Sequence, residues 1–158
     1  MRTFLLAVVS TFLGSSTLFG QWSPDPAVNT PICTAANVQN DAVVISDGAE
    51  GIITAWYDSR SSSTPNIYAQ RINGAGIIQW ASNGIAIAPI ATIQSLPGMI
   101  SDGRGGAIIG WGDFRNGGDI YAQRINPSGV SQWGATGAVV CAAAGVQGNV
   151  RIVSDGGR

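Results

Sequence analysis

Two sets of polar side chains have the residue types and spacing that chemistry at a protein site would need. Each set holds an aspartate, a tyrosine and two arginines: Asp58, Arg60, Tyr68 and Arg71 in the first, and Asp113, Arg115, Tyr121 and Arg124 in the second. The arginines of such a set could hold a carboxylate through paired hydrogen bonds. The tyrosine could act as a nucleophile, with the aspartate as its acid–base partner.

The duplication of the set favours a structural role over a catalytic one. A catalytic centre normally takes different residues from different units of a repeat, whereas a group found in every unit more often stabilises that unit. Trp111, Asp113 and Arg115 alternate, so they share one face of a strand. The next strand returns antiparallel and should bring Tyr121 and Arg124 close. We therefore predict a polar network within each unit, with Asp113 in hydrogen-bond reach of Arg115 or Arg124, and no catalytic residue.

A glycan-active enzyme is the alternative. Sialidases use arginines on a carboxylate, a tyrosine nucleophile and a carboxylic partner. A sialidase-like or other glycan-active enzyme would keep one of the two sets open, with its arginines facing a pocket. The chain has no histidine and a single glutamate, Glu50, which excludes zinc sites of the histidine type and histidine bases.

The Ser-Asp-Gly segments at Asp47 and Asp102 could suggest a calcium site. Each segment offers one carboxylate, however, and Ca²⁺ takes about 6–8 oxygen ligands. We expect each aspartate to accept hydrogen bonds from its own turn. Neither a metal nor a cofactor is predicted.

The repeat extends well beyond these residues. The segment ISDGAEGIITAW at residues 45–56 returns as ISDGRGGAIIGW at residues 100–111, and NIYAQRIN at 66–73 returns as DIYAQRIN at 119–126. A third copy starts with VSDGG at Val153. This periodicity places the units near residues 41–94, 95–147 and 148–158, the last one partial.

Each unit carries four strand signals. In the second copy the first strand ends at residues 98–101. The other three lie at residues 107–115, at 119–126 and within 130–141. Turns with the sequences Asp-Gly, Asn-Gly-Gly and Pro-Ser-Gly separate the four strands. Four strands in about fifty residues, repeated in tandem, are typical of a propeller blade. We predict an all-β fold of four-stranded antiparallel propeller-like blades, two complete and a third partial, preceded by a signal-peptide helix. A propeller takes about 4–8 blades, so we expect the sequence to be an N-terminal fragment of a longer protein.

Four tryptophans recur at fixed positions and are expected to pack the blades. Trp56 and Trp111 close the second strand of each unit, and Trp80 and Trp133 each follow a glycine by four residues. The second pattern resembles the glycine-then-tryptophan hairpin of quinoprotein-like propellers. That resemblance implies that the tryptophan docks one blade on the next. The aspartate of the quinoprotein pattern is missing here, so quinone binding is not expected. We expect Trp111 and Trp133 to be buried.

The N-terminal residues indicate export. Arg2 precedes a short apolar run, too short to span a bilayer, so residues 1–20 are expected to be a signal peptide and residues 21–158 the mature chain. Charged residues make up 11% of the chain and the net charge is −1, which excludes a basic nucleic-acid surface and a polybasic membrane patch. No other stretch could span a membrane. Cys33 and Cys141 hold equivalent positions two repeats apart, too far for a disulfide.

Residues 21–158 resemble a family of secreted bacterial propeller-repeat proteins whose blades read SDGxGGAIIxWxDxR…DIYAQRIN. Members often end in a sorting domain for type IX secretion. The resemblance implies a secreted or cell-surface, non-enzymatic scaffold, or a binding or adhesion module. Its expected partners are an unidentified protein or glycan and the remaining blades of the full-length protein.

Overall fold

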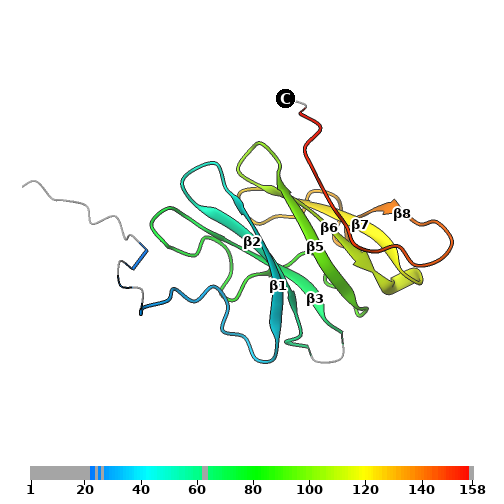
Figure 1. The fold of residues 1–158 in the computed structure, drawn as a ribbon, viewed down its shortest axis with the longest axis horizontal. Coiled ribbons are helices and arrows are strands. Elements are labelled where there is room, and N and C mark those ends of the chain that lie inside the picture. The colour runs from blue at the N-terminus through cyan, green and yellow to red at the C-terminus, as the bar shows by residue number, and fades with distance from the viewer. Residues whose placement is uncertain (1–21, 24, 26, 62–63, 157–158) are drawn as a thin grey trace, which may run out of the picture.

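The fold consists of two four-stranded antiparallel sheets. The computed structural model describes residues 22–23, 25, 27–61 and 64–156, so the expected signal peptide lies outside the described residues. The first sheet has the order β1 (Gln39–Ser46), β2 (Ile52–Asp58), β3 (Asn66–Ile72) and β4 (Ile85–Ala86). The second has the order β5 (Gln94–Ser101), β6 (Ala107–Asp113), β7 (Asp119–Ile125) and β8 (Ala138–Cys141). The all-β, antiparallel prediction is confirmed (Figure 1).

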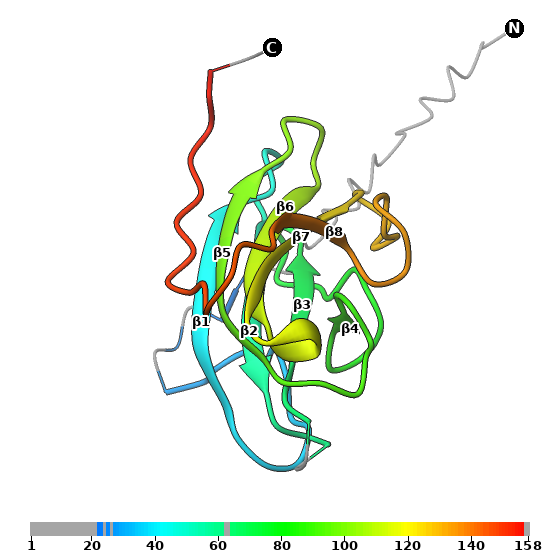
Figure 2. The same ribbon diagram turned by 90° about the vertical axis from the view of Figure 1, so that its right-hand side faces the viewer.

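The described residues do not form a closed ring of sheets. The sheets lie next to each other, with β5 against β1 and β2 (Figures 1 and 2). None of the described residues belongs to a helix long and apolar enough to cross a membrane.

The two sheets are built on the same register. Gln39 pairs with Asp58 at one end of β1 and β2, and Gln94 pairs with Asp113 at the same end of β5 and β6. Each pair of strands contains one register shift, after Asn40 in the first sheet and after Ser95 in the second. An inserted residue of this kind bends a strand and increases its twist. The repeated sequence therefore directs the same local structure twice.

One strand is shorter than the sequence indicates. Strand β6 ends at Asp113 because the Asp113 carboxylate accepts a hydrogen bond from the Arg115 backbone N–H, which starts a 3₁₀ turn over Phe114–Asn116. Gly117 ends the turn with φ of 104°, a conformation that favours glycine. The fourth strand begins only after Gly137, so the predicted interruption near that residue is its start.

The core lies between the sheets. Its first wall is the face of β2 and β3 that carries Ile53, Ala55, Ile67 and Ala69. Residues of β5 and β6, with Met99, Ile109 and Trp111 among them, pack from the other side. Burial of this apolar surface is the main force that holds one unit on the next.

Candidate functional site

Asp113 is the centre of a closed set of polar contacts. Its Oδ1 accepts a hydrogen bond from Arg115 Nε at 2.9 Å and its Oδ2 accepts one from Arg115 Nη2 at 2.6 Å. Trp111 Nε1 also donates to Oδ2, at 2.9 Å. The guanidinium carbon lies 3.8 Å from the centre of the Tyr121 ring. The carboxylate is fully buried and has a bidentate partner, a geometry that favours the charged form.

The first copy repeats these contacts almost atom for atom. Asp58 accepts from Arg60 Nε at 2.9 Å, from Arg60 Nη2 at 2.7 Å and from Trp56 Nε1 at 2.8 Å. The Arg60 guanidinium carbon lies 3.7 Å from the centre of the Tyr68 ring. In both copies Nη2 also reaches a backbone oxygen in the loop before the fourth strand, that of Asn83 or Thr136. The loop is thereby tied to the end of the second strand.

The second arginine of each set lies elsewhere, and our grouping of it with Asp113 was wrong. Arg124 pairs with Asp102 of the Ser-Asp-Gly turn, with 2.8 Å between Nη2 and Oδ2. Arg71 pairs in the same way with Asp47, at 2.9 Å. The antiparallel register explains this result. Arg124 lies opposite Ile108 in β6, five residues from Asp113 and near the other end of the strand.

The turn aspartates also bind their own backbone. Asp102 Oδ1 accepts from the N–H groups of Arg104 and Gly106, both at 2.8 Å. Asp47 makes the equivalent contacts in the first copy. Both carboxylates are buried, and their partners saturate them. Among the described residues no group of three or more cysteine, aspartate, glutamate or histidine side chains could hold a metal ion.

The four aspartates have lowered pKa values. Burial by itself would raise the pKa of Asp58 and Asp113, because a buried carboxylate loses its water. Hydrogen bonds from the arginine and the tryptophan outweigh burial, so both pKa values lie below the ordinary value. Burial would also raise the pKa of Asp47 and Asp102. Hydrogen bonds from backbone N–H groups and from the paired arginine outweigh this effect and lower both pKa values. Carboxylates held this firmly as anions are poor proton donors or acceptors near neutral pH.

The tryptophans after the hairpins differ between the copies. Trp80 is 8% exposed, and its indole N–H donates to the Pro127 carbonyl oxygen at 3.0 Å. Trp133 is 39% exposed, so our expectation that it is buried was wrong. Trp80 is covered because the second unit lies against it, whereas no described sheet covers Trp133. Trp56 and Trp111 are buried in their own units.

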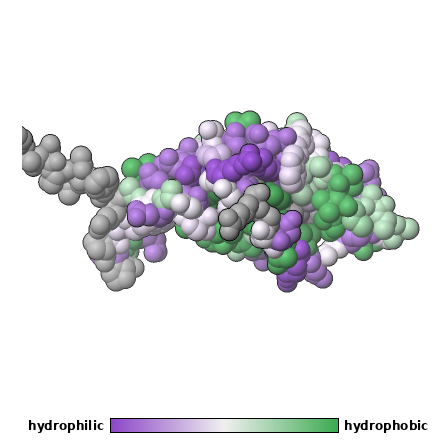
Figure 3. Space-filling model, turned by 90° about the horizontal axis from the view of Figure 1, so that it is seen from above, coloured by the Kyte–Doolittle hydropathy of each residue, from purple (hydrophilic) through white to green (hydrophobic). Residues whose placement is uncertain are grey.

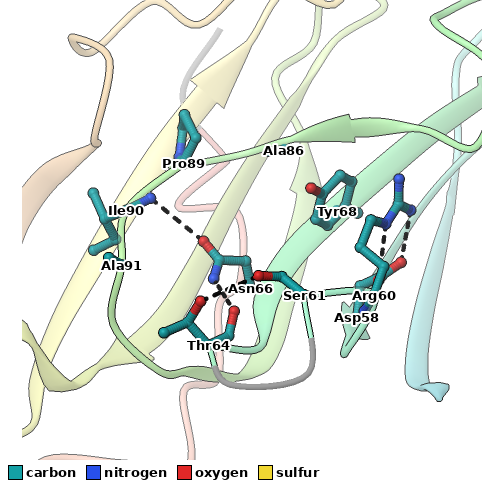
Figure 4. A pocket seen from close by; sticks show the side chains of 10 residues that line it. All are labelled: Asp58, Arg60, Ser61, Thr64, Asn66, Tyr68, Ala86, Pro89, Ile90 and Ala91. Carbon is teal, nitrogen blue, oxygen red and sulfur yellow. Dashed lines mark hydrogen bonds and ion pairs between the residues drawn. The ribbon is translucent and has the colours of Figure 1, made fainter. Parts of the chain in front are cut away.

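A cavity of about 260 Å³ lies beside the first Asp–Arg pair. Figure 4 shows its wall, which combines polar side chains with an apolar edge from the loop after β4. The residues that line it are Asp58, Arg60, Ser61, Thr64, Asn66, Tyr68, Ala86, Pro89, Ile90 and Ala91. The Tyr68 ring stacks against Arg60, and its hydroxyl points away from Arg60 into this space. Within the described part of the chain, neither the Tyr68 hydroxyl nor Arg60 Nη1 has a hydrogen-bond partner.

The two copies differ most where this cavity lies. The loop between the second and third strands has residues 59–65 in the first unit but only the 3₁₀ turn and two glycines in the second. Asn66 is replaced by Asp119. In the second unit Asn116 Nδ2 donates to the Tyr121 hydroxyl at 3.3 Å, a contact without a counterpart among the described residues of the first. The cavity is therefore lined both by the repeated Asp58, Arg60 and Tyr68 and by residues that differ between the units, such as Asn66.

Comparisons with protein-family models, with curated proteins and with solved structures found no match. The structure itself adds one pair of residues that the sequence reasoning missed. Gln70 and Gln123 are fully buried. Gln70 binds the backbone of the segment that carries Trp80, and Gln123 binds the backbone of the segment that carries Trp133. The signal was available, because a polar residue that recurs at an apolar, inward-facing position of a repeat needs a buried partner.

Proposed function

We propose that this protein is a non-enzymatic, extracellular scaffold built from propeller-type units, and that it binds a ligand at its surface. The proposal of export is based on the sequence of residues 1–20. The assignment to propeller-type units is based on two four-stranded sheets of the same register that pack in tandem. A complete ring would need more units than the two described sheets. Surface display or adhesion is the role for which such a scaffold is suited.

One observation carries the non-enzymatic part of the proposal. Both Asp–Arg–Trp sets are closed in the same way, with each carboxylate fully buried against its own arginine. A sialidase-like enzyme would need an arginine cluster open to a substrate carboxylate, in one copy only. The duplicated ion pairs leave both sets occupied by the protein itself, and this supports a structural role.

The cavity beside Asn66 is the best candidate for ligand binding. Asn66 and the loop of residues 59–65 differ between the units, whereas Asp58, Arg60 and Tyr68, which also line the cavity, are repeated. The Tyr68 hydroxyl and the Asn66 amide bring polar groups to a cavity that also has an apolar edge. A small saccharide, with hydroxyl groups on an apolar ring face, fits this combination.

Binding of saccharides to the full chain tests the proposal. A glycan array followed by calorimetry should find a small neutral or weakly acidic sugar whose affinity falls at least about tenfold in Asn66→Ala or Tyr68→Phe, the loss of one or more ligand hydrogen bonds. Tyr121→Phe is the matched control and should bind normally. The same samples should not hydrolyse a fluorogenic sialoside. Hydrolysis that disappears in Arg60→Met would replace the scaffold with the glycan-active alternative.

A further inference from the structure

Two charged side chains line the cavity beside Asn66, and they neutralise each other. These are Asp58 and Arg60. Arg60 Nε donates to Asp58 Oδ1 at 2.9 Å, and Arg60 Nη2 donates to Asp58 Oδ2 at 2.7 Å. The Asp58 side chain is fully buried, and the Arg60 side chain is 22% exposed. The pair therefore offers a ligand no net charge.

Arg60 has no pair of adjacent N–H groups left for a ligand carboxylate. Its Nη2 also donates to the Asn83 carbonyl oxygen at 2.7 Å, so both N–H groups of this nitrogen are used. Both edges of the guanidinium that could hold a carboxylate through two parallel hydrogen bonds include Nη2. The Tyr68 ring covers one face of the group, with 3.7 Å between the ring centre and the guanidinium carbon. Arg60 therefore cannot grip a ligand carboxylate as it grips Asp58.

Asn66 presents a hydrogen-bond acceptor to the cavity. Its Nδ2 donates to the Thr64 carbonyl oxygen at 2.6 Å and to the Thr92 carbonyl oxygen at 3.5 Å, which uses both amide N–H groups. Its Oδ1 accepts from the Ile90 backbone N–H at 3.4 Å, and an amide oxygen can accept two hydrogen bonds. Figure 4 shows the amide between the loop that carries Thr64 and the segment that carries Ile90. One lone pair of Oδ1 is therefore left for a ligand.

The Tyr68 hydroxyl is a further uncharged polar group that faces the cavity. A phenol hydroxyl can both donate and accept a hydrogen bond. In the second unit the equivalent Tyr121 hydroxyl already accepts from Asn116 Nδ2 at 3.3 Å. The loop after β4 adds an apolar edge, and Figure 3 shows that hydrophobic and hydrophilic side chains alternate over the surface without one large patch of either kind. A ligand of this cavity thus needs a hydrogen-bond donor for Asn66 Oδ1, a polar partner for Tyr68 and an apolar face.

We propose that this cavity selects uncharged saccharides and rejects sugars that carry a carboxylate. The inference rests on the proposed binding of a saccharide at the same cavity. One hydroxyl of a neutral sugar donates to Asn66 Oδ1, and a second is hydrogen-bonded to the Tyr68 hydroxyl. An ionised carboxylate accepts hydrogen bonds and donates none, so it would face the Asn66 oxygen without a proton between them. It would also lose water without gaining a cation, because Arg60 is already paired with Asp58. The contacts that hold the scaffold thereby also decide which sugars are excluded.

Matched pairs of sugars test this selection on the full wild-type chain. The probes are the methyl glycosides of glucose, galactose and mannose, each beside its uronic acid, which differs only by a carboxylate in place of the CH₂OH group. Titrations followed by ligand-observed NMR at neutral pH should show that the neutral member of a bound pair binds at least about tenfold more tightly. Its affinity should not change with added salt, which screens charges. A uronic acid that binds as tightly as its neutral partner would overturn the selection and leave saccharide binding in place. Absence of binding by every sugar would overturn the proposed function as well.

Fluorinated analogues of the bound sugar test the acceptor role of Asn66. Fluorine in place of one hydroxyl group keeps nearly the same size but cannot donate a hydrogen bond. At one ring position fluorination should weaken binding to the wild-type chain about tenfold, because it leaves Asn66 Oδ1 without a donor. The same analogue should bind Asn66→Ala as well as the parent sugar does, since the acceptor is gone. Asn116→Ala in the second unit is the matched control and should behave as wild type. An effect of fluorination that is the same in wild type and in Asn66→Ala at every position would contradict the assigned contact.

Discussion

Four buried aspartates are each held by an arginine, and the same two pairings occur in both units. Each pair joins segments that backbone hydrogen bonds alone would not fix. Arg60 connects the end of β2 to the loop before β4 through the Asn83 oxygen, and Arg71 connects β3 to the Ser-Asp-Gly turn. A buried ion pair adds little net stability, but the loss of one partner strands a charge in the interior. These residues are therefore better suited to fixing one arrangement of the strands than to chemistry.

The lowered pKa values predict that acid destabilises the protein. An aspartate whose pKa is lower in the folded state than its unfolded value near 3.9 contributes stability that is complete above about pH 4 and is lost as the pH falls through the folded pKa. Urea unfolding at neutral pH and near pH 3 should show this loss. Asp113→Asn should be less stable at neutral pH and should lose less on acidification. An equal acid loss in the variant would mean that Asp113 does not contribute.

Trp111 and Trp133 are the same residue type in different surroundings, so their substitution tests how much burial contributes to stability. Trp111 is completely buried, so Trp111→Ala should lower the free energy of unfolding by about 3–5 kcal/mol. Trp133 is 39% exposed, and Trp133→Ala should cost far less. Thermal melting of the two variants gives the comparison. Similar losses in both variants would show that Trp133 belongs to the core.

The sequence placed Asp113 in hydrogen-bond reach of Arg115 or Arg124 without choosing between them, and it did not show that Arg124 lies near the other end of the hairpin. The alternation of Trp111, Asp113 and Arg115 was enough to put the first pair on one face. The position of Arg124 depends on the register of β6 and β7, where Asp113 lies opposite Asp119. Counting from the Asn-Gly-Gly turn would have given this register. The cavity beside Asn66 was beyond sequence reasoning, because residues far apart in the chain form its wall.

At the scale of the elements, glycines in the loops before the fourth strands set how closely the loop can approach the core. An added Cβ at Gly137 would lie 2.6 Å from the Trp111 ring and 2.8 Å from the Ala122 oxygen. Gly84 has the same relation to Trp56 and to the Ala69 oxygen. The sequence predicted a break in the fourth strand near Gly137 and most other strand limits within a few residues. It could not reveal that the break lets a tryptophan fit beneath the loop.

Gly137→Ala tests this close approach against a glycine of the same backbone conformation. Gly134 has φ of 75° and Gly137 has φ of 77°, so alanine at either position carries about 1–2 kcal/mol of backbone strain. Only Gly137→Ala adds a clash with the indole and the backbone, which should cost about 1–3 kcal/mol more. Gly134 has open space around it. Chemical denaturation that ranks the two variants equally would show that the loop can move away from Trp111.

At the scale of the whole molecule, the two units are alike in their own contacts and differ in what lies against them. Trp80 is docked and Trp133 is exposed, although both follow the same hairpin in the sequence. A repeat pattern predicts the unit and the kind of neighbour it needs, but the exposure of a given residue depends on whether that neighbour is present. The loop beside Asn66 and the exposure of Trp133 are two places where the units differ.

The central proposal is that the repeated Asp–Arg pairs hold the scaffold together and do no chemistry. Arg60→Met and Arg115→Met test this claim most directly, because each leaves a fully buried aspartate without its partner. We predict that both variants lower the free energy of unfolding by similar amounts, up to about 3 kcal/mol, when measured by urea denaturation. A site that binds or transforms a ligand is often strained, and removal of its charged residue then stabilises the protein. A neutral or stabilising effect of one substitution, beside a clear loss for the other, would contradict the structural role.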